Sequence, residues 1–395
     1  MTGRDRAPRV ALLVNMVAPY RVALYDEIAR YLDLDVLYSG HEDNRVGWEG
    51  ADRRLERARA RRVWGWVFKR KRPSIGRPGS VRHWDLRYLH ISPGYGIDLV
   101  RSRPAAIITC EMGLRTLTAI GYGLLTGIPV WVMIESSLHS ERHPGPVRSL
   151  VRAAIARLAH RWIAVGECSA EYLASRKVPE SRITTIQNTV DERPFSRVER
   201  FAPAVGEKPI ALHVGQLVHR KGVALLLEAV ATLSARGIGI SVVIAGDGPE
   251  RHQLEARARE LMLSDVSFVG QCPTDQIAAL LARASFLVFP TLDDVWGLVV
   301  NEALWSGVPV LGSCHAGCAK ELLPTRNIFD PLDHDGFVEA LERAALGGLA
   351  PADRTRLWST AKAARRVAGT VLAALGSRVA YSVDPSISGA HRTPP

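Results

Sequence analysis

The chain alternates short, continuously apolar segments with segments of helical periodicity, and this alternation restricts its possible folds more than any other feature. In the first half the apolar segments are RVALLVNMV, LDVLYSG, AAIITCE, PVWVMIES and RWIAVGE. The segment YRVALYDEIARYL, between the first two, has apolar residues at helical spacing. Strands that are apolar on both faces and separated by helices are typical of a parallel sheet covered on both sides. The first half is therefore predicted to be an α/β layer structure.

A second series of the same kind begins after the polar, proline-containing stretch TVDERPFSRVERFAPAVGEKP. Its expected strands include IALHVGQL, ISVVIAGDG, VSFVGQ and FLVFPT, again separated by helix-length segments. Because 395 residues exceed one typical core, we predict two Rossmann-like parallel-sheet domains that face each other across a cleft. The expected boundaries are 1–195 for the N-terminal domain, 196–208 for a linker, 209–376 for the C-terminal domain and 377–395 for a disordered tail.

Net charge and cysteine usage limit the possible partners and location. The formal net charge of +11 favours an anionic partner, such as a phosphate compound, a nucleic acid or an acidic membrane. Neither a helix-turn-helix nor an aromatic RNA-binding motif is evident, so we predict no nucleic-acid partner. Five scattered cysteines without a CxxC pair indicate reduced thiols. No apolar run reaches the ~20 residues that span a bilayer, and we expect a cytoplasmic protein.

Residues 53–83 interrupt the alternation with a cluster of basic residues around Trp64, Trp66 and Phe68. One interpretation is a solvated loop or helix face. The other is an interfacial element, with aromatic rings at the depth of the lipid headgroups and arginines on anionic lipid. The second interpretation predicts peripheral association with the inner membrane face.

Metal-binding patterns are weak in this sequence. CHAGC, residues 314–318, offers two thiols and an imidazole but lacks the second ligand pair of a zinc motif. DLD at 33–35 and DHD at 333–335 lie at a helix–strand turn and late in a loop, respectively, which disfavours a metal role. We therefore predict no metal and no cofactor.

The stretch TLDDVWGLVVNEALWSGVPVL, residues 291–311, carries two acidic positions at an informative spacing. A buried strand runs into the loop with Asp294, and a helix is expected to begin near Gly297 and to end at Gly307. Free amides and the helix dipole at such a start suit a phosphate. Asp294 and Glu302 lie too far apart for an acid pair. They can instead lie on either side of a ligand, with each carboxylate accepting hydrogen bonds from its hydroxyl groups.

These residues resemble the signature of the retaining, GT-B-fold glycosyltransferases of the fourth sequence family, also called glycosyl transferases group 1. In that pattern two glutamates are separated by seven residues; here Asp294 stands at the first position and Glu302 at the second. HAGCAKE, residues 315–321, is similar to the turn that follows. Upstream, HVGQLVHRKGVALLLEAV, IAGDGPERHQLE, VSFVGQ and IQNTVD fit the family in order.

Several positions depart from the family pattern. Gln216 replaces a usual Arg, and Arg220 beside Lys221 is expected to supply that charge. The first strand lacks a double-glycine loop, and the strand PVWVMI ends in Glu135 where many relatives carry His. The C-terminal end lacks the usual closing pattern, so the helix that crosses back to the N-terminal lobe is expected to be altered or short.

The resemblance implies a hexosyltransferase that moves a sugar from a UDP- or GDP-sugar to a glycan or lipid-linked acceptor, without a metal and with retention. It further implies that Arg220 and Lys221 neutralise the leaving diphosphate and that Asp294 holds the donor sugar. The alternative is a non-catalytic, donor-binding scaffold. The remaining candidate residues fall into two groups. Those on the donor side are Gly215, Gln216, Gly246, Asp247, Trp296, Gly297, Leu298 and Glu302, and those on the acceptor side are Asn15, Tyr20, Arg21, Glu135 and His139.

Overall fold

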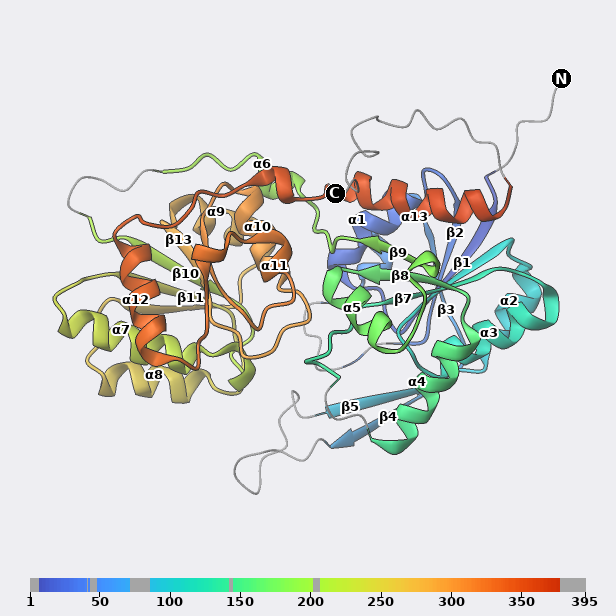
Figure 1. Ribbon diagram of the computed structural model, residues 1–395, viewed down its shortest axis with the longest axis horizontal. Helices are drawn as coiled ribbons and strands as arrows, with labels where there is room; N and C mark the ends of the chain where they lie inside the picture. Colours follow the sequence, from blue (N-terminus) through green and yellow to red (C-terminus); the bar gives the residue numbers. More distant parts are fainter. Residues whose placement is uncertain are drawn as a thin grey trace, which may run out of the picture.

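The protein has two lobes, each built on a parallel sheet with helices on both faces (Figure 1). The computed structural model describes residues 7–40, 42, 48–71, 86–141, 145–201 and 207–376. The predicted disordered tail at 377–395 lies outside the described residues, as does part of the predicted linker.

The first sheet has seven parallel strands in the order β3-β2-β1-β6-β7-β8-β9. The strands predicted from continuous apolar runs are all present, and β1 is buried at every position after its first residue. Helices α2 and α3 pack together, as do α3 and α4. The strand bounds are β1 Arg9–Val14, β2 Asp33–Tyr38, β3 Arg59–Arg62, β6 Ala106–Cys110, β7 Val130–Ile134, β8 Arg161–Val165 and β9 Ile183–Ile186. The helices are α1 Pro19–Ile28, α2 Gly94–Ser102, α3 Leu114–Thr126, α4 Pro146–Leu158 and α5 Glu167–Ser175.

The second sheet has the order β12-β11-β10-β13-β14-β15, also parallel. The order reverses between β10 and β13, and such a switch point places the carboxyl ends of both strands at a ligand crevice. The strands are β10 Ile210–Val214, β11 Ser241–Ala245, β12 Val266–Gly270, β13 Phe286–Phe289, β14 Val310–Ser313 and β15 Ile328–Phe329. The helices are α6 Arg193–Ser196, α7 Val223–Ala235, α8 Arg251–Glu260, α9 Thr274–Arg283, α10 Leu298–Trp305, α11 Ala319–Leu322, α12 His334–Ala345 and α13 Thr360–Ala374.

Two segments of the described part of the basic-aromatic stretch form β strands, whereas a solvated loop or helix face had been one of the expected structures. Its first part forms β3, which pairs with β2 at the edge of the first sheet. Its next part is β4, Trp66–Lys71, which pairs antiparallel with β5, Leu86–Ile91. Side chains alternate across such a ribbon, so Trp66 and Phe68 share one face and are half exposed. The many basic residues of this stretch hid the period-two pattern from which the strand could have been predicted.

The last described helix, α13, returns to the first lobe (Figure 1). It contacts α1, and its apolar side chains join the same core as β1 and β2. The helix expected to be altered or short thus runs for 15 residues, because its small and branched apolar residues recur at helical spacing. Residues 360–374 had been grouped with the second domain, but by their contacts they complete the first lobe.

Candidate functional site

Lys221 and Asp294 form a buried ion pair at the carboxyl ends of β10 and β13. Lys221 Nζ contacts Asp294 Oδ2, and the two side chains are 11% and 17% exposed. The ammonium also lies 5.0 Å from the centre of the Phe289 ring. Arg220 Nη1 donates to the carbonyl oxygen of Asp293 at 3.0 Å. The consecutive residues Arg220 and Lys221 therefore both contact the loop that carries Asp293 and Asp294.

Local backbone geometry brings the two loops together. Lys221 ends the 3₁₀ turn His219–Lys221, and Gly222 follows with a φ of 69°. A Cβ at Gly222 would lie 2.0 Å from the carbonyl oxygen of Pro290, so only glycine allows this approach. Leu292 N then donates to the carbonyl oxygen of Arg220 at 2.7 Å. Ordering of the turn thus positions the lysine before any ligand arrives.

Burial and the neighbouring opposite charges act against each other on the pKa values of this pair. Burial alone raises the pKa of Asp294, but the Lys221 ammonium and the Arg220 guanidinium outweigh it and hold that pKa below its usual value. Burial lowers the pKa of Lys221, and the Asp294 carboxylate opposes that change. Asp294 Oδ1 also accepts from Trp296 N at 3.3 Å, so both carboxylate oxygens have protein partners.

A pocket of about 290 Å³ adjoins this ion pair. It brings together predicted donor-side residues that follow β10 and β11 with one from within α10, namely Gly215, Gln216, Gly246, Asp247 and Glu302. A Cβ at Gly215 would lie 3.9 Å from both Cδ and Cε of Lys221, which places the pocket and the ion pair side by side. The two acidic positions of the 291–311 stretch thus have separate places, Asp294 on the lysine and Glu302 in the pocket wall.

Glu302 has the opposite electrostatics to Asp294. Burial raises the pKa of Glu302 from 4.5 to about 8. The carboxyl is therefore mostly protonated at neutral pH, and it can both donate and accept hydrogen bonds. Such a group suits a neutral polyol, for example a ribose, better than it suits a cation.

Helix α10 begins where the sequence predicted, directly after Gly297. Gly297 has a φ of 98°, and a Cβ on it would lie 2.6 Å from the Phe289 ring. Phe289 thus contacts both the helix start and the Lys221 ammonium. The amide of Leu298, in the first turn of this helix, has no intrahelical acceptor and belongs to the positive end of the helix dipole.

Trp296, a predicted donor contact, is a buried packing residue instead. Its side chain is 3% exposed, and its Nε1 donates to Asn301 Oδ1 at 2.7 Å. Asn301 Nδ2 in turn donates to the carbonyl oxygen of Asn188. A Cβ at Gly166, in the first lobe, would lie 2.5 Å from the Trp296 ring. The indole therefore joins the lobes, because its large apolar face is buried between them.

On the acceptor side, Arg21 and Glu135 meet as an ion pair. The guanidinium of Arg21 contacts Glu135 Oε1, and Asn188 Nδ2 donates to Glu135 Oε2 at 3.4 Å. The same guanidinium lies 5.5 Å from the centre of the Tyr20 ring, whose edge packs on Trp48. The predicted Tyr20, Arg21 and Glu135 thus lie together.

Asn15 belongs to a second cluster, which includes residues that sequence analysis missed. Asn15 Nδ2 donates to Glu111 Oε2 at 3.1 Å, and the Arg115 guanidinium contacts both Asn15 Oδ1 and the carbonyl oxygen of Cys110. Glu111 has a φ of 67°, an uncommon conformation for a non-glycine residue. Its position directly after the buried strand AAIITC was the available signal.

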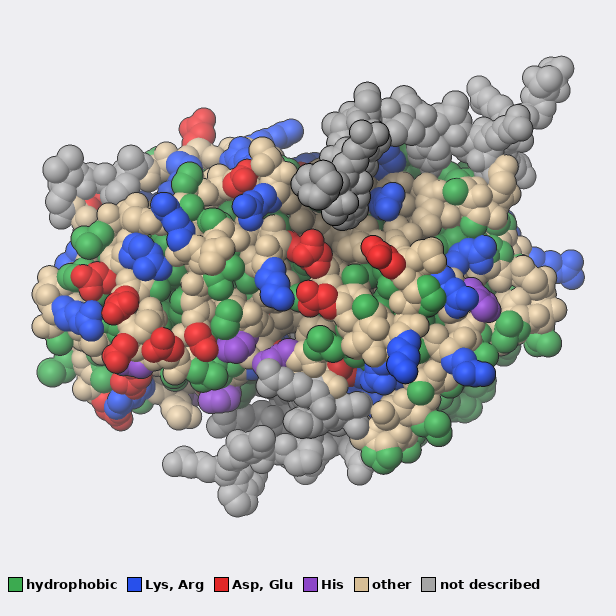
Figure 2. All heavy atoms as spheres, viewed as in Figure 1, with side chains coloured by type: hydrophobic (Ala, Val, Ile, Leu, Met, Phe, Trp, Pro, Cys, Tyr) green, Lys and Arg blue, Asp and Glu red, His purple; other side chains and the backbone are tan. Residues whose placement is uncertain are grey.

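His139 lies opposite the loop that carries Asp293 and Asp294. Its Nε2 is 3.8 Å from Asp293 Oδ1, and its ring centre is 5.6 Å from that of His315. In Figure 2 histidine side chains gather near the boundary of the two lobes. The predicted acceptor-side histidine therefore faces the second lobe.

Glu321 links the lobes in a way that the sequence did not reveal. Its Oε1 accepts from the backbone amide of Glu167, the first residue of α5, at 2.6 Å. Burial raises the pKa of Glu321 to about 7. A carboxylate at a helix start is stabilised by the dipole, and here the helix and the carboxylate belong to different lobes.

Comparison with known proteins agrees with this geometry. Residues 196–362 match the model of the family described as Glycosyl transferases group 1. This match spans less than half of the chain and contains the 291–311 stretch from which the family resemblance was stated. Over this segment the comparison agrees with that resemblance.

Curated relatives of the chain include two proteins from Streptomyces kanamyceticus. A 2-deoxystreptamine glucosyltransferase is 28% identical, and the match covers 47% of this chain and 53% of that protein. An alpha-D-kanosaminyltransferase is 27% identical, and the match covers 55% of this chain and 62% of that protein. The chain thus spans little more than half of these relatives. A GDP-mannose-dependent alpha-mannosyltransferase of Mycolicibacterium smegmatis is 26% identical over 85% of this chain and 87% of its own.

Solved structures confirm the predicted GT-B fold. The lipopolysaccharide outer core galactosyltransferase WaaB superposes with a TM-score of 0.70 at 15% identity, covering 93% of this chain and 99% of that one. The Anabaena protein HepE in complex with UDP-glucose superposes with a TM-score of 0.64 at 15% identity, covering 93% and 98%. Among the described residues, no helix combines the length and apolarity that a membrane span requires.

Proposed function

We propose that this protein is a retaining glycosyltransferase, of the hexosyltransferase type, that uses a UDP- or GDP-sugar donor. The observation that carries the proposal is the contact between Lys221 and Asp294 beside a pocket whose wall contains Glu302. The relatives named as sugar transferases and the UDP-glucose complex of a structural neighbour support it. The acceptor in this proposal is a glycan or a lipid-linked saccharide, as in polysaccharide or glycolipid biosynthesis.

In this proposal the protein stabilises the leaving diphosphate with its own charges. Lys221, Arg220 and the amide of Leu298 surround the position where the diphosphate would lie, next to Phe289 and the start of α10. Donors fixed in place before the reaction stabilise developing charge without reorganisation. These cations replace a metal ion at the phosphates, and each such donor typically contributes ~3 kcal/mol to the transition state.

Asp294 and Glu302 then act on different parts of the donor. Both oxygens of Asp294 already have partners, so its first role is to hold Lys221, and its remaining lone pairs accept a sugar hydroxyl. Glu302, mostly protonated at neutral pH, hydrogen-bonds the ribose in the pocket. The acceptor approaches from the side of Arg21, Glu135 and His139, and the leaving phosphate takes its proton.

A ligand screen tests the donor site. Thermal unfolding is followed with UDP, GDP, ADP and their common sugars, with Mg²⁺ and with a chelator. One nucleotide at 100 times its dissociation constant should stabilise the fold by ~2.7 kcal/mol whether or not a metal is present. Lys221→Ala should lose this shift, whereas Lys208→Ala, at an exposed ion pair, should keep it. The absence of a shift with every nucleotide would overturn the proposal.

Turnover separates an enzyme from the alternative, a donor-binding scaffold without catalysis. The donor that gives the shift is incubated with oligosaccharide and lipid-linked acceptors, and the products are followed by mass spectrometry. NMR of the new linkage should show the anomeric configuration of the donor. Donor binding without transfer or hydrolysis would favour the scaffold.

We further propose that the β4–β5 ribbon binds an anionic membrane surface. Trp64, Trp66, Phe68 and Leu89 are each at least half exposed, and the exposed Arg61 and Arg62 precede Trp64 in the sequence. Aromatic rings with neighbouring arginines suit the headgroup region of a bilayer. Co-sedimentation with phosphatidylglycerol vesicles should exceed that with phosphatidylcholine vesicles, and Trp66→Ser/Phe68→Ser should reduce it. Equal binding to both vesicle types would contradict this proposal.

A further inference from the structure

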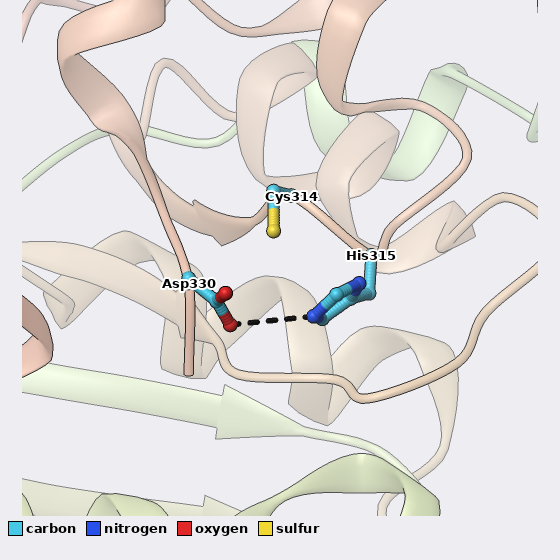
Figure 3. A group of neighbouring side chains, drawn as sticks. All are labelled: Cys314, His315 and Asp330. Carbon is cyan, nitrogen blue, oxygen red and sulfur yellow. Dashed lines mark hydrogen bonds and ion pairs between the residues drawn. The ribbon is translucent and has the colours of Figure 1, made fainter. Parts of the chain in front are cut away.

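Three side chains of different chemistry converge beside the donor loop. The thiol of Cys314, the imidazole of His315 and the carboxylate of Asp330 each offer one ligand atom, and these atoms lie within 4.8 Å of one another. Figure 3 shows them pointing toward a common centre. His315 Nε2 and Asp330 Oδ1 are already 3.3 Å apart.

The sheet fixes the positions of these groups. Cys314 and Asp330 directly follow the neighbouring parallel strands β14 and β15, and Cys314 N donates to the carbonyl oxygen of Phe329 at 2.8 Å. His315 N donates to Ser313 Oγ at 3.0 Å, which holds the intervening turn. Asp330 Oδ1 also accepts from a backbone amide two residues later, at 2.9 Å, so the carboxylate has a fixed orientation. The arrangement therefore does not depend on flexible loops.

We propose that Cys314, His315 and Asp330 bind one divalent transition-metal ion of the Zn²⁺ class. A thiolate, an imidazole and a carboxylate form a donor set that suits zinc and disfavours magnesium or calcium, which require oxygen ligands. Zinc–ligand bonds of about 2.0–2.3 Å in tetrahedral geometry place ligand atoms roughly 3.5 Å apart. The His315–Asp330 pair meets this distance, and the Sγ of the exposed Cys314 lies within 4.8 Å of both of the other ligand atoms.

A plain surface ion pair between His315 and Asp330 is the competing explanation. Such a pair needs no thiol, whereas Cys314 follows the strand next to that of Asp330 and its Sγ completes a triad. The other cysteine of the CHAGC segment does not take part, because the buried Cys318 directs its Sγ toward the carbonyl oxygen of Gly297. The sequence pattern failed because the third ligand lies 15 residues downstream of His315.

The proposed ion is distinct from the donor pocket, whose lining includes none of the three residues. It would nevertheless act on the donor loop, since Asp294 N donates to the carbonyl oxygen of His315 at 3.4 Å and Gly317 N donates to that of Asp294 at 3.0 Å. His139 of the first lobe lies across from it, with its ring centre 5.6 Å from that of His315. The ion would therefore stiffen the turn that holds Asp294 where the lobes meet.

Cobalt binding to the full, untagged chain tests this proposal directly. The protein is reduced, stripped of metal and titrated with Co²⁺, whose spectrum reports both tetrahedral geometry and thiolate ligation. We expect one Co²⁺ per chain with a thiolate-to-cobalt band that Zn²⁺ abolishes. Cys314→Ser should remove that band, and His315→Ala and Asp330→Asn should each weaken binding more than tenfold.

Two matched variants serve as controls. Cys272→Ser removes another partly exposed thiol, and His252→Gln removes an imidazole that is 97% exposed. Both should bind Co²⁺ like the unchanged chain. All three ligand positions lie at or near the surface, and circular dichroism verifies that each variant folds. The absence of a thiolate band, or a band that Cys314→Ser retains, would overturn the proposal.

Discussion

Two carboxyl groups of the 291–311 stretch show how the environment of a residue decides its role. Asp294 contacts an ammonium and has a lowered pKa, whereas Glu302 is half-buried in the pocket wall and its desolvation raises its pKa to about 8. The sequence indicated that both positions matter, but it could not distinguish them, because the ammonium comes from a loop 73 residues away. The family resemblance implied separate roles for Lys221 at the diphosphate and for Asp294 at the donor sugar, and it did not imply a contact between the two side chains.

Removal of one partner of the buried pair should be costly. Lys221→Ala leaves the Asp294 carboxylate buried without its counter-charge, and we expect the free energy of unfolding to fall by about 3–5 kcal/mol. Lys208→Ala removes half of an exposed pair and should cost at most ~1 kcal/mol. Urea unfolding measures both. If Lys221→Ala/Asp294→Ala were destabilised by the sum of the single changes, the two charges would not be coupled.

Glu302 should make the stability depend on pH. Its pKa is about 8 in the folded chain and near 4.5 in the unfolded one, so the folded state retains a proton that the unfolded state has lost. The stabilisation is complete below about pH 4.5 and is lost as the pH rises through 8. Glu321, with a pKa of about 7, contributes with the same sign.

Glu302→Gln should therefore flatten this dependence. Because glutamine does not ionise, the variant should lose less stability than the unchanged chain between pH 5 and pH 8. Urea midpoints at four pH values measure the difference, and the exposed Glu180→Gln serves as the control. Parallel curves for Glu302→Gln and the unchanged chain would contradict the raised pKa.

At the scale of elements, the turn before α10 depends on a single glycine. Gly297→Ala would place a Cβ 2.6 Å from the Phe289 ring at a φ of 98°, so we expect a loss of stability and of nucleotide binding. Gly121→Ala, inside helix α3 with no atom within 4 Å of its Cβ, should be neutral or stabilising by up to ~1 kcal/mol. Thermal unfolding with and without the nucleotide compares them. Equal behaviour of the two variants would show that the left-handed turn is dispensable.

The pattern of apolar residues predicted the buried strands of the two parallel sheets, but it did not predict the β4–β5 ribbon. Strands such as β1 and β13 are apolar at almost every position because helices cover both faces, and that pattern is visible in the sequence. Both strands of the β4–β5 ribbon mix exposed apolar side chains with basic residues, so neither shows the continuous apolar run of a buried strand. Its two strands are stabilised by antiparallel pairing with each other, and this pairing cannot be inferred from the amino-acid composition.

At the scale of the whole molecule, the site depends on contacts that join distant parts of the chain. The donor pocket could be predicted because its residues lie in motifs of one lobe. The Glu321–Glu167 link and the Arg115–Asn15 contact could not, since they connect residues 154 and 100 positions apart and leave no periodic signal. The predicted donor-side residues therefore come together in one pocket, whereas contacts of the predicted acceptor-side residues involve partners that the motifs did not indicate.

Helix α13 should stabilise the lobe that it contacts and not the one that precedes it in sequence. Leu372 is 1% exposed in the core of the first lobe, and we expect Leu372→Ala to cost about 2–5 kcal/mol. Hydrogen exchange should accelerate in α1 and β1 while α7 and β10 stay protected. Arg365→Ala, on the exposed face of the same helix, should change neither. Faster exchange confined to the second lobe would contradict this assignment.

The return of α13 also constrains the order in which the chain acquires its structure during synthesis. A ribosome that has released residues 1–359 has delivered every strand of the first sheet, but not the helix whose side chains close the core between α1 and β2. The second lobe has its own core and needs nothing made later. The lobe that is synthesised first is therefore completed only after the second lobe has been made, and a nascent chain must carry its open apolar surface until α13 has emerged.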